Sequence, residues 1–187
     1  MVERTGGKTV KITGTAILAA MVIVFDYTLK FSGLKIPFPW MPFLKFDFTG
    51  IPIVLSYLLF GASSAASTSL IACLGIVARS GDLVGGSMKA LAEFSTVMGL
   101  AAGRRFTGGG DRVVSMRGAY IFASALLARI TAMSIFNLVT LPWYYGVPFS
   151  VALGMLPLLG VFNGMQGALT VGLGEVLYIA YRKRVPV

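Results

Sequence analysis

The chain has no histidine, a single cysteine and only seven acidic residues among its 187. Without histidine, the usual zinc sites and the Ser-His and Cys-His nucleophile pairs are excluded. The one cysteine, Cys73, lies in an apolar segment, so an intramolecular disulfide and a thiol metal site are excluded as well. No closely spaced carboxylate pair and no Gly-x-x-x-x-Gly-Lys-Ser/Thr loop is present. We therefore expect neither an enzyme nor a resident metal or cofactor, and no nucleotide-driven pump acting alone.

Charged residues of any kind are scarce. They make up 12% of the chain, whereas soluble domains carry about 25%. Hydrophobic residues make up 56%, and the apolar runs reach the roughly 20 residues that cross a hydrocarbon core. This composition predicts an all-α integral membrane protein in a lipid bilayer. Residues 1–187 are expected to form a single membrane-embedded domain, because no separate soluble domain fits in this length.

The apolar segments predict a bundle of six transmembrane helices. They cover residues 10–29, 51–60, 62–78, 86–103, 118–141 and 149–181. The second segment is too short to cross a bilayer alone, so we expect it to begin within the preceding connection or to pair closely with the third. The first apolar run lacks an Ala-x-Ala-like cleavage site, which favours a retained helix over a signal peptide.

The basic residues predict how the bundle is oriented. Sixteen Lys and Arg against seven Asp and Glu give a net charge of +9, and most of the cations cluster between apolar segments. This clustering is typical of positive-inside retention rather than of nucleic-acid binding. Both termini are therefore expected to be cytoplasmic, together with the connection between the fourth and fifth spans; the inner cations are Arg4, Lys8, Lys11, Arg104, Arg105, Arg112, Arg117 and Arg182–Arg184. Lys30, Lys35, Lys45, Arg79 and Lys89 fall on the other side, where functional use of some of them would explain the exception.

A polar segment precedes the second span. Lys45 and Asp47 stand among aromatic residues there, and charge at the rim of a bilayer is costly unless it is used. The preceding residues 37–42 contain three prolines and disfavour helix, so an irregular connection is expected. This connection has the character of a lid over a site. A second aromatic-rich outer connection holds Trp143 and Tyr144, which favour a membrane interface and are also suited to stacking on a flat ligand.

Several polar side chains lie inside the predicted spans. Arg129 is near mid-depth and needs a counter-ion, for which Glu93 and Glu175 are both candidates. The amides of Asn137, Asn163 and Gln166 either bond between helices or read hydroxyls and imides of a ligand; these alternatives stay open.

Small residues form a face on the first span. Ala16 and Ala20 are four residues apart, so they share one side of a helix. Such faces allow close helix approach in lipid, either within the chain or against a partner membrane subunit.

Four segments together resemble an S component of an energy-coupling factor (ECF) vitamin transporter, most closely the riboflavin-specific type. Residues 44–52, LKFDFTGIP, are similar to the family segment LKIDFSDIP. Residues 136–146 contain FN and LPWYYG, similar to FN and LPLYG, and residues 161–167, VFNGMQG, are similar to PFNLIKG. The Ala-x-x-x-Ala motif of the first helix matches Ala16 and Ala20. Two positions depart from the pattern: Gln166 replaces Lys, and Gly50 replaces Asp.

The resemblance implies a six-helix substrate-binding subunit in the cell membrane, with its pocket under the outer loops. Such a subunit captures a vitamin, which is riboflavin or FMN by this resemblance. A transmembrane coupling subunit and two ATPase subunits drive import, and Ala16 and Ala20 contact that module. The expected ligand contacts are Lys45, Phe46, Asp47, Asn137, Trp143, Tyr144, Asn163 and Gln166. Alternatives are an S component for another water-soluble vitamin, such as pantothenate or a thiamine precursor, and a stand-alone secondary carrier.

Overall fold

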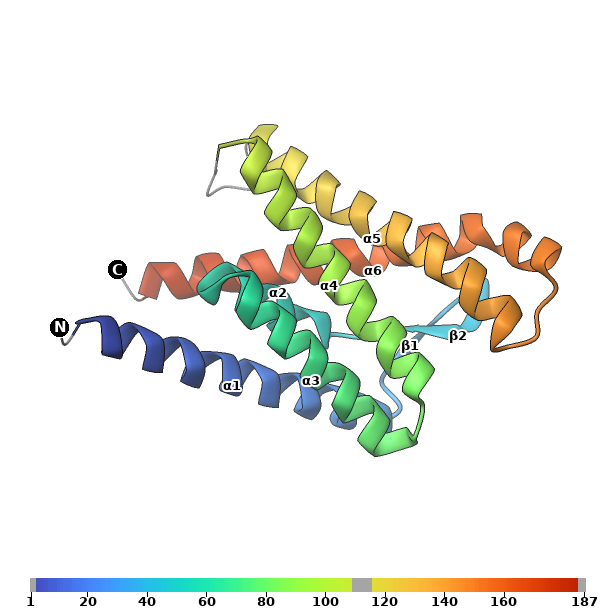
Figure 1. Ribbon diagram of the computed structural model, residues 1–187, viewed down its shortest axis with the longest axis horizontal. Helices are drawn as coiled ribbons and strands as arrows, with labels where there is room; N and C mark the ends of the chain where they lie inside the picture. The colour runs from blue at the N-terminus through green and yellow to red at the C-terminus, as the bar shows by residue number, and fades with distance from the viewer. Residues whose placement is uncertain (1–2, 109–115, 185–187) are drawn as a thin grey trace.

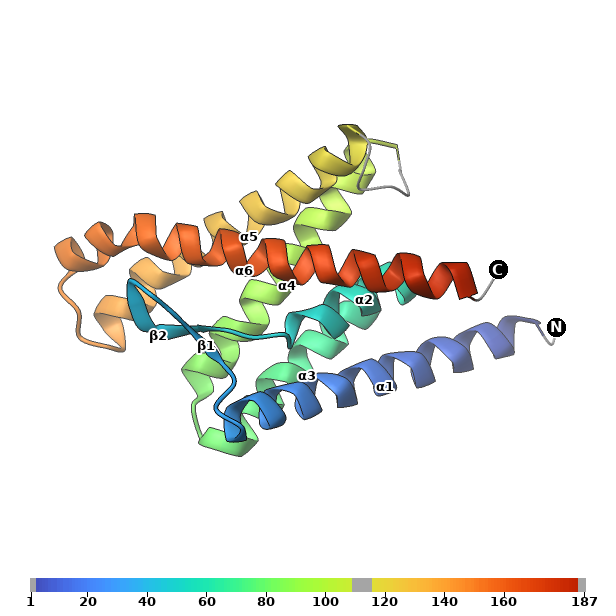
Figure 2. The ribbon, with the colours of Figure 1, turned by 180° about the vertical axis from the view of Figure 1, so that it is seen from behind.

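The computed structural model describes residues 3–108 and 116–184, with the side chains of residues 3–6 left out. These residues form six helices and one two-stranded hairpin (Figures 1 and 2). The elements are α1 (Glu3–Phe31), β1 (Ile36–Phe38), β2 (Met41–Phe46), α2 (Gly50–Phe60), α3 (Ala62–Ser80), α4 (Leu83–Phe106), α5 (Met116–Trp143) and α6 (Phe149–Arg184). The prediction of a mainly helical bundle is confirmed, and each predicted span has one helix. Arg112, counted among the inner cations, lies outside the described residues.

Four of the helices are long and apolar enough to cross a membrane: α1, α3, α5 and α6. Helix α2 has only 11 residues, as its short apolar run predicted. Helix α4 has 24 residues but carries Lys89 and Glu93 in its interior, and it does not belong to these four. The chain is therefore a multi-pass membrane protein. Helix α2 differs from the four long apolar helices in its length, and α4 differs from them in its interior charges.

The connection between α1 and α2 differs from the sequence expectation. It avoids helix, as its prolines require, but it is not irregular, because β1 and β2 pair antiparallel with Ile36 opposite Phe46. The pairing shifts register between Pro37 and Phe38, since proline has no N–H to continue the ladder. The hairpin packs on α6 through Phe38 and Phe46, whose ring centroids lie 5.5 Å and 5.0 Å from that of Phe162.

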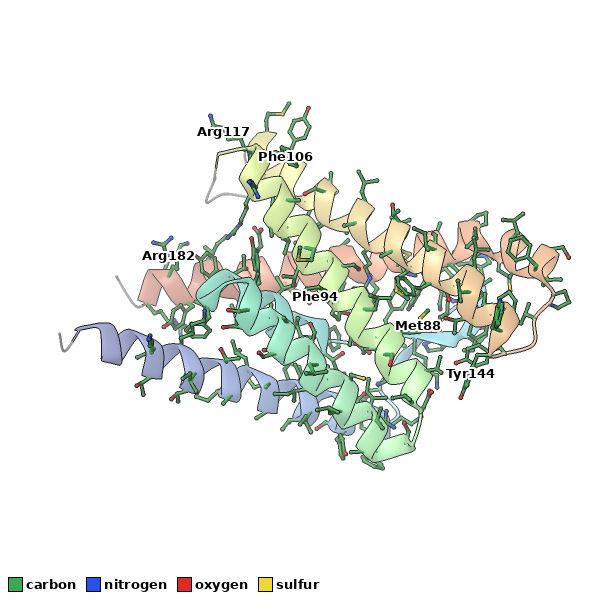
Figure 3. The ribbon with its side chains drawn as sticks, in the orientation of Figure 1. Met88, Phe94, Phe106, Arg117, Tyr144 and Arg182 are labelled. Atoms are coloured by element: carbon green, nitrogen blue, oxygen red, sulfur yellow. The ribbon has the colours of Figure 1, made fainter. Side chains whose placement is uncertain are left out.

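The two ends of the bundle differ in charge. Both termini lie at one end, here called the terminal end, and the hairpin and the α5–α6 connection lie toward the other, the hairpin end (Figure 1). Arg117 and Arg182 lie at the terminal end and Tyr144 at the hairpin end (Figure 3). This placement puts the described inner cations at the last turns of α4 and α6 and at the start of α5 on the terminal end.

The outer surface of the long helices is apolar. Only 22–33% of the most hydrophobic windows of the four spanning helices is buried inside the protein. The exposed apolar side chains include Ile17 on α1, Leu74 on α3, Ile135 on α5 and Val176 on α6. Large contiguous apolar surfaces are disfavoured in water, so this surface fits a lipid environment.

Helices α4 and α5 approach each other closely at glycine. A Cβ atom built on Gly99 would lie 2.6 Å from the Cα of Ala125, and one on Gly103 would lie 2.9 Å from the Cα of Ile121. In lipid, helix association depends on such close backbone packing. The contact matters for the site because α4 and α5 both contribute charged residues to it.

We predict that Gly99→Ala destabilises the bundle, because the added methyl meets backbone atoms of α5 that cannot move aside. Overpacking of this kind costs about 1–3 kcal/mol. The midpoint of thermal unfolding in detergent measures the change. The matched control is Gly172→Ala on α6, where a Cβ atom meets nothing within 4 Å. Equal midpoints for the two variants would contradict the close-packing account.

Candidate ligand-binding site

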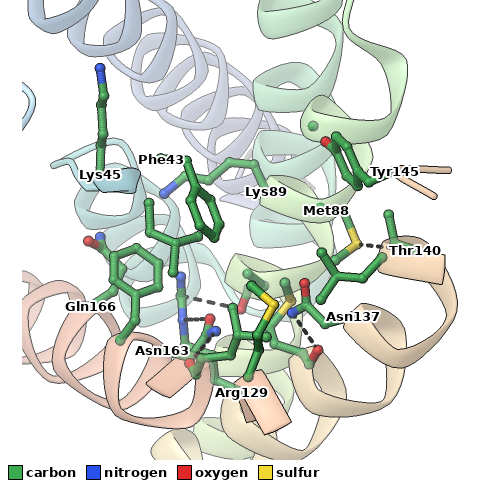
Figure 4. A pocket seen from close by; sticks show the side chains of 18 of the residues that line it. Phe43, Lys45, Met88, Lys89, Arg129, Asn137, Thr140, Tyr145, Asn163 and Gln166 are labelled. Atoms are coloured by element: carbon green, nitrogen blue, oxygen red, sulfur yellow. Dashed lines mark hydrogen bonds between the residues drawn. The ribbon is translucent and has the colours of Figure 1, made fainter. Parts of the chain in front are cut away.

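A cavity of about 620 Å³ lies at the hairpin end, between the hairpin, α4, α5 and α6. This volume is in the range of small-molecule sites. Its lining residues come from elements far apart in sequence: Phe43, Leu44, Lys45, Asp47, Asp82, Gly85, Met88, Lys89, Ala92, Arg129, Met133, Asn137, Thr140, Leu141, Tyr145, Val147, Met155, Leu159, Phe162, Asn163 and Gln166. Figure 4 shows Lys89, Arg129 and Asn163 on one side and Met88, Thr140 and Tyr145 across from them.

Charged groups link the lid to the helices beneath it. Lys89 Nζ lies 2.7 Å from Asp47 Oδ1 on the hairpin side and 2.8 Å from Glu93 Oε1 one turn along α4. Arg129 Nη1 of α5 lies 3.1 Å from the same Glu93 oxygen. Glu93 is fully buried and Arg129 is 2% exposed, so each charge compensates the other within an apolar medium. The structure thereby assigns Glu93 rather than Glu175 as the partner of Arg129.

The pKa of Asp47 is set by opposing effects. Burial raises it, whereas the positive charges of Lys89 and Lys35 and the hydrogen bonds from Lys89 and Thr49 lower it. The net result is a pKa below the ordinary value of 3.8. Thr49 also donates its backbone N–H to Asp47 Oδ1, 3.2 Å away, at the start of α2. One carboxylate therefore orders the junction between lid and helix and stays ionised at neutral pH.

Gln166 ties the same junction to α6. Its Nε2 donates to the backbone oxygen of Asp47 at 2.8 Å, and its Oε1 accepts from the backbone N–H of Asp47 at 3.3 Å. The amide thus satisfies both backbone polar groups of one residue beside the cavity, which a lysine at this position cannot do because an ammonium only donates.

Gly50, the other departure from the family pattern, is explained by Glu93. A Cβ atom on Gly50 would collide with Glu93 Oε2 and would lie 2.7 Å from the Thr170 methyl carbon. An aspartate there would also place a second carboxylate against a buried one. The chain holds its acidic group on α4, so the start of α2 has to be glycine.

The two asparagines line the cavity in different ways. Asn163 accepts from Arg129 Nε at 3.3 Å and donates to Leu159 O at 2.9 Å, so it positions the guanidinium. Asn137 donates to Met133 O at 2.7 Å, and among the described residues its Oδ1 has no donor. Asn137 therefore offers a free acceptor to the cavity.

Of the other predicted ligand contacts, one lies at the rim of the cavity and three lie outside it. Lys45 reaches the cavity rim, and its exposed side chain points away from the interior (Figure 4). Phe46 does not line the cavity, because its ring packs on Phe38 and Phe162. Trp143 is 89% exposed and Tyr144 59% exposed, and neither is on the cavity wall. The structure therefore does not bring these three aromatic side chains to the site.

Several lining residues were missed as ligand contacts. Lys89 and Arg129 carried a signal, since one was a cation outside the inner group and the other lay deep in a span. Tyr145 was not among the predicted contacts: it was open, like Trp143 and Tyr144, to an interface or a stacking role, and nothing in the sequence distinguishes which ring after α5 turns inward. Phe43 gave no separate signal.

Two sequence predictions lie outside the cavity. Ala16 and Ala20 are both exposed on α1, as a partner-facing surface requires. Asp26 is buried and pairs with Lys35 and Arg79, at 2.7 Å and 2.8 Å, which joins α1, the hairpin connection and α3. These contacts explain two of the cations at the hairpin end.

Comparisons with known proteins agree with this architecture. No family model matches the chain, and no curated protein matches it. Among solved structures, it is similar to one described as the structure and mechanism of the S component of a bacterial ECF transporter. The TM-score is 0.77 at 21% identity, over 96% of this chain and 99% of that chain. The protein therefore has the fold of an ECF S component.

Asp47→Asn is predicted to loosen the lid, because Lys89 and Thr49 lose their anionic partner. Removing one side of a buried charged hydrogen bond costs about 1–3 kcal/mol. Amide hydrogen exchange over residues 41–49 should accelerate about tenfold or more. Asp82→Asn is the control. Asp82 caps the start of α4 by accepting a hydrogen bond from the Gly85 N–H, and asparagine replaces aspartate as a helix cap at little cost. Equal exchange in both variants would contradict the role of Asp47.

The lowered pKa also predicts how lid stability depends on pH. A carboxylate whose pKa is lower in the folded state than in the unfolded state contributes its full stabilisation at pH values above its unfolded-state pKa. This stabilisation is lost as the pH falls through the folded-state pKa. The protection factor of the amides at residues 41–49, which is corrected for the intrinsic pH dependence of exchange, should thus show no Asp47-dependent change between about pH 8 and about pH 5, and should fall in stronger acid. Asp47→Asn should remove that fall. An Asp47-dependent transition near neutral pH would disprove the assignment.

Proposed function

We propose that this protein is the substrate-binding S component of an ECF-type transporter in the cell membrane. The observation that carries the proposal is a cavity of about 620 Å³ beneath a charged hairpin, in a chain with the S-component fold. Neither the cavity nor the fold supplies an energy source. Import therefore requires a transmembrane coupling subunit and two ATPase subunits, and all six helices are taken to be membrane-embedded.

Charge supports the orientation in this proposal. The cations at the terminal end are retained in the cytoplasm by the positive-inside rule, which puts the cavity on the outer side. Three of the outer cations, Lys35, Arg79 and Lys89, are engaged in ion pairs and so are compatible with that side.

The ligand in this proposal is a water-soluble vitamin, with riboflavin or FMN first among the candidates. Support comes from the sequence segments at residues 44–52, 136–146 and 161–167 and from the mixed polar and apolar lining. A flat ring would lie against Phe43 and Tyr145 rather than Trp143 or Tyr144, since only the first two line the cavity.

Equilibrium titration of the purified protein with a panel of water-soluble vitamins tests the binding role. One vitamin should bind saturably with a stoichiometry of one. Co-expression with an ECF coupling subunit and its ATPases should then give ATP-dependent uptake of that vitamin. Uptake without those subunits would indicate a stand-alone carrier and overturn the proposal.

Asn137→Ala is predicted to weaken vitamin binding without destabilising the protein, because its free Oδ1 serves the ligand and its only bond is local. The loss of a hydrogen bond in a dry pocket is about 1–3 kcal/mol, or about ten- to a hundredfold in Kd. Asn163→Ala should weaken binding and also lower the unfolding midpoint, since Arg129 loses a partner. Unchanged affinity in both variants would contradict the placement of the ligand.

The double variant Ala16→Leu/Ala20→Leu is predicted to abolish transport and leave vitamin affinity unchanged. Bulky side chains on this exposed face block close approach of a partner helix. Ala119→Leu/Ala123→Leu is the matched control, because these alanines are exposed with the same spacing on α5. Loss of vitamin binding in the α1 variant would assign that face to the internal fold instead.

A further inference from the structure

Seven charged side chains form one alternating chain from the surface to the cavity. In order they are Arg79, Asp26, Lys35, Asp47, Lys89, Glu93 and Arg129. The Lys35–Asp47 step is the longest at 3.9 Å, and the other steps are 2.7–3.1 Å. Because both ends are arginine, four cations face three carboxylates. The series carries one positive charge in excess.

The excess is concentrated at the cavity. Arg129 is the buried end of the series, and its single carboxylate partner, Glu93, is shared with Lys89. The other end, Arg79, has a side chain 12% exposed, so water can solvate it. A buried charge with half a counter-ion is strongly disfavoured unless another anion is at hand.

Arg129 also has unused donors that face the cavity. Its Nε donates to Asn163, and its Nη1 contacts Ala92 O, Thr96 Oγ1 and Glu93. Among the described residues Nη2 makes no hydrogen bond, although Arg129 lines the cavity and is 2% exposed. Lys89 uses two partners and has a third N–H. These groups stand on the same side of the cavity (Figure 4).

The opposite wall does not repeat this chemistry. Met88, Met133, Leu141 and Tyr145 supply mainly apolar surface there, and Asn137 offers an acceptor. The carboxylate of Asp82 on this wall caps α4 by accepting from the Gly85 N–H. Among the described residues, the cations of the lining, apart from Lys45 at the rim, thus gather at Arg129 and Lys89, and most of the remaining wall is apolar.

We propose that the ligand carries an oxyanion, a carboxylate or a phosphate, which binds at Arg129 Nη2 and Lys89 Nζ while its apolar part fills the rest of the cavity. The anion completes the alternation, giving four cations and four anions. This inference rests on the proposed binding role and narrows its ligand class from vitamins in general to those with an acidic group.

Two ligand pairs that differ only in the acidic group test the proposal on the wild-type protein. FMN and riboflavin differ by a phosphate, and pantothenate and pantothenol differ by a carboxylate. The acidic member of the pair that binds should have a Kd lower by about tenfold or more, as charge-assisted hydrogen bonds are stronger than neutral ones. The pair that shows binding identifies phosphate or carboxylate. A neutral member that binds as tightly as its acidic counterpart overturns the inference and leaves the S-component proposal intact.

Arg129→Gln removes the excess cation and leaves three cations against three carboxylates, with Glu93 still paired to Lys89, so it should erase the preference for the acidic ligand. Lys30→Gln is the control, because Lys30 is an exposed cation at the hairpin end of α1 that is not on the cavity wall. A preference retained in Arg129→Gln assigns recognition to other groups and overturns the inference.

A measurement without any vitamin keeps the two proposals separable. Inorganic phosphate or acetate, compared with chloride at equal ionic strength, should raise the unfolding midpoint of wild-type protein and of Lys30→Gln but not of Arg129→Gln. If no vitamin binds, the S-component proposal fails, and this shift alone decides the inference. No shift in the wild type with either anion overturns it.

Discussion

A fully buried glutamate inside a helical bundle controls the arrangement of this protein. Glu93 needs cations within reach, and Lys89 and Arg129 supply them from α4 and α5. The pairing requires close approach of those helices, which Gly99 allows, and it excludes a side chain at Gly50 at the start of α2. Gly167 of α6 also leaves room for the Arg129 stem, since a Cβ atom there would lie 3.1 Å from Arg129 Cδ. Four helices are thus positioned by one carboxylate.

The same electrostatics extends to the lid. Lys89 is shared between Glu93 in the interior and Asp47 at the end of the hairpin, so the state of the lid is linked to the charges on the cavity wall. Gln166 adds a neutral clamp on the Asp47 backbone, and the rings of Phe38, Phe46 and Phe162 hold the hairpin on α6. A ligand that draws on Lys89 therefore competes for the cation that holds Asp47, which connects binding to lid stability through a single shared ammonium group.

Much of the fold could be predicted from the sequence, because apolar runs and their breaks set the helices almost directly. The hairpin was missed because proline argues against helix without specifying strand. For the site, Asp47 and the amides Asn137, Asn163 and Gln166 line the cavity, and their contact with a ligand stays a prediction. Periodicity does not show which amide serves the ligand and which serves the lid. Trp143 and Tyr144 were placed at the site and lie outside it, because the last turn of α5 and its exit direct only Tyr145 inward. The sequence did not identify the counter-ion of Arg129, because the choice between Glu93 and Glu175 depends on how α4 and α6 are rotated about their axes.

The central claim is that this cavity holds a vitamin, and a high-resolution structure of the protein with the best-binding vitamin tests it most directly. The account predicts ligand density between the hairpin, α4, α5 and α6, with an acceptor group within hydrogen-bond distance of Arg129 Nη2 and a ring against Tyr145 or Phe43. A vitamin bound elsewhere on the molecule, with the cavity filled only by water, would contradict it.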